Sequence, residues 1–98
     1  MLTEAALEAA GAELAGRFAG REYGAIRVCG ATSAVVADGT AERGVALHLR
    51  LAPATDAWPP DVIADLRRDV RAEVRTFPEQ FSVRLHFRAA AGEEPTPA

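Results

Sequence analysis

Three side chains in this sequence are of types that bind transition metals. They are Cys29, His48 and His86. Each lies in a segment with the alternation of a β-strand, so all three should project from the face opposite the apolar residues. One cysteine and two histidines could form half of a zinc or copper site. Arginines on the same segments oppose a cation, and no ligand-spacing motif joins the three, so we expect no metal and no other cofactor.

Arginines form the second candidate site. Four of them lie on these strand-like segments: Arg27, Arg50, Arg84 and Arg88. A sheet would gather them with His48 and His86 into one basic face. This basic face predicts a docking surface for an acidic partner, a phosphate group or RNA. We favour contact with a protein partner or a second copy, because guanidinium groups form paired hydrogen bonds with carboxylates and are enriched at interfaces. The alternative is a solvated face whose charges pair with their neighbours.

Trp58 has two interpretations. It stands directly before a Pro-Pro pair, in a connection between a strand and a helix. It either holds the start of that helix against the core or stays exposed as an anchor for a partner. We therefore include it among the candidate partner-binding residues.

Sequence motifs of enzymes are missing. The sequence has no dinucleotide-binding or phosphate-binding glycine motif, no Gly-x-Ser-x-Gly motif and no His-x-x-x-His motif. We therefore expect a protein that is not an enzyme. The formal net charge of −3 argues against nucleic acid as a partner, because binding to nucleic acid depends on cationic contacts to phosphates.

Composition places the chain among globular proteins. Its 98 residues fit one domain, and 49% are hydrophobic. Every basic residue is Arg and Ala is the commonest residue, which we interpret as the codon bias of a GC-rich bacterial genome. No apolar stretch approaches the roughly 20 residues that span a bilayer, and Glu4 and Glu8 stand where a signal peptide would carry positive charge. We expect a cytoplasmic protein that does not insert into membranes.

Hydrophobic periodicity predicts the helices and strands that position these residues. Apolar residues recur every three or four positions over 3–18 and 61–77, which is typical of amphipathic helices, and Thr3 should cap the first of them. Strict alternation over 45–51 and 81–87 predicts two half-buried strands. Residues 23–38 contain either one long strand bent at a bulge near Gly30 or two short strands, and we favour two.

These elements predict an α+β domain over residues 1–89. The expected order is helix, two or three strands, helix, strand. We expect a small antiparallel sheet of three to four strands, with both helices packed on one face and the other face solvated. The turn signal at 38–44 begins with Asp-Gly. Residues 90–98, with two prolines, should form a disordered tail.

From Val45 onward this layout resembles the alkaline-shock protein family, also called the bacterial envelope stress response family. Residues 44–51, 60–74 and 81–87 carry the resemblance, and the helix at 7–18 fits the family's opening helix in position. Thr76 is followed by Phe77, where the family commonly has glycine. The resemblance implies a non-enzymatic stress-response protein that self-associates and is recruited beneath the cell envelope by membrane-anchored partners.

A KH-like or ferredoxin-like module that binds RNA or a small ligand is the alternative. A KH module would need a Gly-x-x-Gly loop between two helices, with basic residues beside it. The sequence has no such loop in that setting. We therefore prefer an interaction protein.

Overall fold

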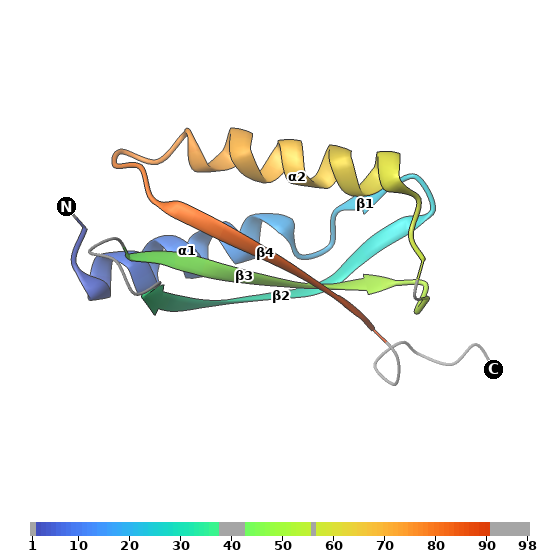
Figure 1. Ribbon diagram of the computed structural model, residues 1–98, viewed down its shortest axis with the longest axis horizontal. Coiled ribbons are helices and arrows are strands. Elements are labelled where there is room, and N and C mark those ends of the chain that lie inside the picture. The colour runs from blue at the N-terminus through green and yellow to red at the C-terminus, as the bar shows by residue number, and fades with distance from the viewer. Residues whose placement is uncertain (1, 38–42, 56, 91–98) are drawn as a thin grey trace.

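The computed structural model describes residues 2–37, 43–55 and 57–90. In chain order its elements are α1 (Glu4–Phe18), β1 (Glu22–Tyr23), β2 (Ile26–Ala37), β3 (Arg43–Ala52), α2 (Pro60–Val74) and β4 (Ser82–Ala89) (Figure 1). The strands form one mixed sheet in the order β1-β2-β3-β4. The expected α+β fold is confirmed. The predicted turn residues 38–42 and tail residues 91–98 lie outside the described residues.

The core lies between the helices and the inner face of the sheet. Leu47, Leu49 and Leu51 of β3 are each 0% exposed. Side chains from both helices meet this row: Leu14, Ala15 and Phe18 from α1, and Leu66, Val70 and Val74 from α2. Full burial of one such leucine stabilises the fold by about 1.5–3 kcal/mol. The α2 stripe predicted from the sequence therefore faces the core, although α2 ends at Val74, three residues earlier than expected.

Strand β4 differs from the antiparallel arrangement that we expected. It pairs with β3 in parallel, whereas β2 pairs with β3 antiparallel. Helix α2 carries the chain back along the sheet, so β4 runs in the same direction as β3. Alternation in the sequence indicates that one face of a strand is buried and the other is exposed to solvent. It does not indicate the direction of the neighbouring strand.

Residues 26–37 form one strand, so the preference for two strands was wrong. The β2–β3 register shifts between Val28 and Gly30, which leaves Cys29 as the extra residue of a bulge. The bulge moves the inward-facing positions by one residue. Before it Val28 faces the helices, and after it Val35 does so, opposite the buried Val45. A strand without the bulge would turn one half of its apolar residues toward solvent.

Helix α1 approaches the sheet closely at one glycine. Thr3 caps the helix by accepting a hydrogen bond from the Ala6 amide at 3.1 Å. A Cβ at Gly11 would lie 2.8 Å from Ser33 Oγ and 3.0 Å from Val45 Cγ1. A Cβ at Gly16 would meet no atom within 4 Å. The first glycine therefore permits close contact between α1 and the sheet, and the second has no such role.

Two glycine substitutions should therefore have opposite effects on stability. Gly16→Ala should raise the free energy of unfolding by up to about 1 kcal/mol, because it removes the helix cost of glycine. Gly11→Val should lower it by about 1–3 kcal/mol, because the larger side chain overpacks the contact with β2 and β3. Urea unfolding followed by circular dichroism measures both, and wild-type stability in Gly11→Val would contradict the close-approach argument.

Glu73 of α2 joins the two helices. Its carboxylate accepts a hydrogen bond from Arg17 at 2.9 Å and another from Arg21 at 2.8 Å. Nearby, the Tyr23 hydroxyl donates to the Asp69 carboxylate at 2.9 Å. These contacts link the end of α1 and the short strand β1 to the last turns of α2. They fix the position of α2 over the sheet.

The Glu73 contacts predict acid sensitivity. Hydrogen bonds from Arg21, and then from Arg17, hold the pKa of Glu73 below its usual value. The stability that they contribute is complete above the ordinary glutamate pKa of about 4.3 and is lost as the pH falls through the lower folded-state pKa. Glu73→Gln should therefore unfold at lower urea concentration than wild type at pH 7, and the difference should shrink below about pH 4. A difference that stays constant from pH 7 to pH 3 would contradict this role.

Candidate functional site

The predicted basic residues gather on the outer face of the sheet, opposite the helices. Register aligns them in rows across β2, β3 and β4. One row is Gly30, Arg50 and Arg88, and the next is Thr32, His48 and His86. Arg84 follows beside Ala46, and Arg27 lies opposite Ala52. We call Arg27, Arg50, Arg84, Arg88, His48 and His86 the outer-face cluster.

Two histidines form the centre of the outer-face cluster. The His48 and His86 rings stack with centroids 4.8 Å apart and an interplanar angle of 15°. Cys29 lies at the bulge rather than with the histidines, and its sulfur is 3.6 Å from an Arg27 guanidinium nitrogen. Within the described part of the chain, no group of three or more His, Cys, Asp or Glu side chains is arranged to hold a metal ion. The sheet therefore does not bring the three candidate ligands together.

Arg50 lies across β2, above Gly30. A Cβ on that glycine would come within 2.9 Å of Arg50 Nε and within 2.8 Å of Cζ. The glycine thus leaves room for the guanidinium to lie flat on the neighbouring strand. Arg27, Arg50 and Arg84 each take part in at least one further interaction, so none of the three is without a partner.

The outer-face cluster contrasts in charge with the rest of the chain. The outward positions of β2, β3 and β4 carry no Asp or Glu in the described residues, and Glu22 of β1 lies opposite Arg27 at one edge. The whole chain nevertheless has a formal net charge of −3. One face of an acidic protein is therefore basic, and a carboxylate-bearing surface would be attracted to it.

Trp58 does not join the outer-face cluster. Its indole Nε1 donates a hydrogen bond to the Pro53 carbonyl at 3.1 Å, and its ring packs against the hydrophobic core. The ring therefore belongs to the helix side of the sheet, beside the start of α2. Of the two interpretations of Trp58, this geometry supports the one that holds the helix against the core.

Sequence reasoning missed a groove between α2 and β4. Its volume is about 330 Å³, and Arg67, Arg71 and Arg75 lie along one side of it. A signal for it was present, because these arginines recur every fourth residue and therefore share one side of a helix. The pattern was not recognised in the sequence, because acidic residues lie between these arginines in the chain and project from other sides of the helix.

Comparisons with known proteins give no relative for this chain. No family model, curated protein or solved structure matches it significantly. In the described residues, neither helix combines the length and the apolar character needed to cross a bilayer. The resemblance to alkaline-shock proteins therefore stays a prediction.

Proposed function

We propose that this protein is a non-enzymatic interaction domain that docks through its outer-face cluster onto an acidic protein surface. The main observation behind the proposal is that the sheet separates basic residues on its outer face from apolar residues on its inner face. Helices cover the inner face, while four arginines and two histidines occupy the face that neither described helix covers. Guanidinium groups can pair with carboxylates through two hydrogen bonds each, which favours a specific contact over general attraction.

Charge also decides which partner fits. Two copies that met through the same outer face would place arginines opposite arginines, which repel. A second copy could instead offer the exposed side of its α1, where Glu4, Glu8 and Glu13 lie among alanines. Self-association of this kind is head-to-tail, and it forms rings or open chains rather than a closed dimer. A different protein with carboxylates on its surface could pair with the same arginines.

The size of the face favours a transient, salt-sensitive contact. Ten-residue β3 is about 33 Å long, and three strands with their side chains span about 15–20 Å. The face therefore buries about 500–650 Å² per partner, which is near the low end for specific interfaces. Such an interface depends on electrostatic attraction for its rate of formation, so binding should weaken as salt rises.

The resemblance to envelope stress-response proteins supports the same function. It implies a cytoplasmic protein that self-associates and is recruited by partners anchored at the cell envelope. An RNA-binding module is the alternative. A polyanion would meet an overall net charge of −3, and the outer-face cluster contains no Phe, Tyr or Trp for base stacking.

Charge reversal tests this function. Arg50→Glu with Arg84→Glu should leave the fold intact, because both side chains lie on the outer face, and should abolish docking. Arg68→Glu makes a charge reversal on α2, away from this face, and is the control for the single reversal Arg50→Glu, which should weaken docking. Gly30→Ala keeps every charge but displaces Arg50, and should weaken docking partially.

Two measurements give the outcome. Light scattering at low and high salt reports self-association, and pull-down from a bacterial extract reports partner capture. We expect wild type and Arg68→Glu to associate at low salt and the double variant to fail. A wild type that stays monomeric and captures nothing, or a double variant that associates as wild type does, would refute the function. Tight binding of wild type to single-stranded RNA would favour the alternative.

A further inference from the structure

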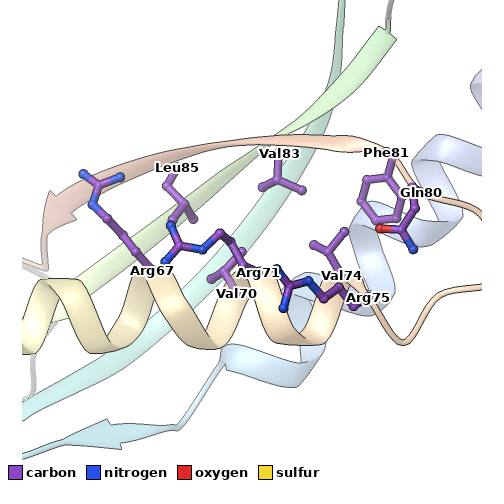
Figure 2. A pocket seen from close by; sticks show the side chains of 9 residues that line it. All are labelled: Arg67, Val70, Arg71, Val74, Arg75, Gln80, Phe81, Val83 and Leu85. Atoms are coloured by element: carbon purple, nitrogen blue, oxygen red, sulfur yellow. The ribbon is translucent and has the colours of Figure 1, made fainter.

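The groove between α2 and β4 lies on the helix side of the sheet, away from the outer-face cluster. Val83 and Leu85 point from β4 toward α2, and the arginine side chains extend along the helix beside them (Figure 2). Val70 and Val74 complete an apolar floor. None of the lining residues is acidic. The groove therefore combines apolar walls with a cationic rim.

Helix α2 leaves the inner row of β4 partly uncovered. Val83, Leu85 and Phe87 are only half-buried, whereas their partners on β3, Val45, Leu47 and Leu49, are 1%, 0% and 0% exposed. The two rows face the same side of the sheet, so the difference comes from the position of the helix. Arg67 lies over the Phe87 ring, 5.1 Å from its centroid, so Val83 and Leu85 are the members of the row that line the groove. Half-buried apolar residues on an edge strand are typical of a surface that another chain covers.

Strand β4 is also an edge of the sheet. It pairs with β3 on one side, and no described strand pairs with its other side. The backbone N–H and C=O groups of an edge strand can pair with an added extended segment. Peptide-binding domains use this arrangement, in which main-chain hydrogen bonds give affinity and alternate side chains enter a neighbouring groove.

The arginines have the spacing that such a peptide requires. Arg67 and Arg71 of α2 and Arg75, which follows its last residue in a helical backbone conformation, are four residues apart, so they rise about 6 Å from one to the next. Alternate residues of an extended chain are about 6.6–6.8 Å apart and share one face. Three carboxylates at alternate positions would therefore follow the three arginines in register. Within the described part of the chain, Arg71 and Arg75 make no hydrogen bond or ion pair of their side chains.

We propose that this groove binds an extended peptide of a protein partner, with glutamates at alternate positions, added as a further strand along β4. The two methylene groups of each glutamate would lie against the valine and leucine floor, while its carboxylate reaches the arginine rim. This site is separate from the outer-face cluster, and it can hold its ligand whether or not that face is occupied.

Single-stranded nucleic acid explains fewer of these observations. Its phosphates have a comparable spacing, but it gains nothing from the backbone of an edge strand. Its approach is also opposed by the net charge of the chain, which is −3. A peptide uses the edge strand, the apolar floor and the arginine rim together.

Fluorescence anisotropy with synthetic peptides tests the proposal on the full chain. The probe is a labelled peptide in which four glutamates alternate with four threonines. A block peptide, with all the glutamates before all the threonines, has the same composition without the alternation. Two further peptides carry N-methyl groups on alternate backbone amides, one for each of the two possible registers.

The alternating peptide should bind saturably, and the block peptide should bind at least about tenfold more weakly, because its glutamates cannot follow the arginines. Binding should also be lost with N-methylation in one register, because the main-chain hydrogen bonds to β4 are removed.

Variants of the protein locate the site. Arg71→Glu should weaken binding of the alternating peptide by about tenfold or more, since it places a like charge at the centre of the rim. Arg68→Glu is the matched control, because it makes the same charge change on an exposed side chain that pairs with Asp65 outside the groove. Its affinity should stay within about twofold of wild type. The outer-face variant Arg50→Glu with Arg84→Glu should also bind the peptide normally, which separates this site from the proposed docking face.

Three results would overturn the proposal. One is the lack of saturable binding at about 1 mM peptide. Another is equal affinity for the alternating, block and N-methylated peptides, which would mean general charge attraction. The third is preferential binding of an oligouridylate with the same dependence on Arg71, which would make the groove a nucleic-acid site.

Discussion

Burial of one row of β3 beneath two helices is the contact on which the other features of this protein depend. Leu47, Leu49 and Leu51 are each 0% exposed, and residues of both helices meet them. With both helices on one face, no described helix covers the other face of the sheet. The polar residues that alternate with the leucines are therefore gathered outside, and the basic outer face is a consequence of how the core is built.

The position of α2 explains the second surface. Glu73 ties this helix to the end of α1 through Arg17 and Arg21. Held there, α2 covers the inner row of β3 together with α1 but covers β4 only partly, so the inner row of the edge strand stays half-exposed beside the arginines of the helix. The same helix that completes the core thus leaves a groove at its margin. Core formation and the two candidate binding surfaces have one common cause.

Both surfaces are basic, although the chain as a whole is acidic. Separation of charge of this kind comes from the geometry of the elements rather than from composition. Strand alternation collects arginines on the outer face, and four-residue spacing collects others along α2. Acidic residues occupy the remaining helix surfaces, where Glu8 and Asp65 are exposed. A protein with this distribution can attract acidic partners on two sides, while its net negative charge opposes non-specific binding of polyanions.

Local periodicity was enough to predict the α+β fold and the shared face of Arg50, Arg84, His48 and His86. Both depend on which side of an element is buried, and that information repeats every two or 3.6 residues. The α1 cap at Thr3 was predicted from residue type, because a threonine hydroxyl can accept a hydrogen bond from a backbone amide of the first turn. Only the tertiary structure decided that β4 runs parallel to β3, that a bulge at Cys29 keeps β2 in one piece, and that Trp58 faces the core. The α2–β4 groove also belongs to this group. Each of these features depends on which distant segments of the chain pack together. A local pattern indicates that one face of an element is buried, but it does not indicate which segment packs against that face.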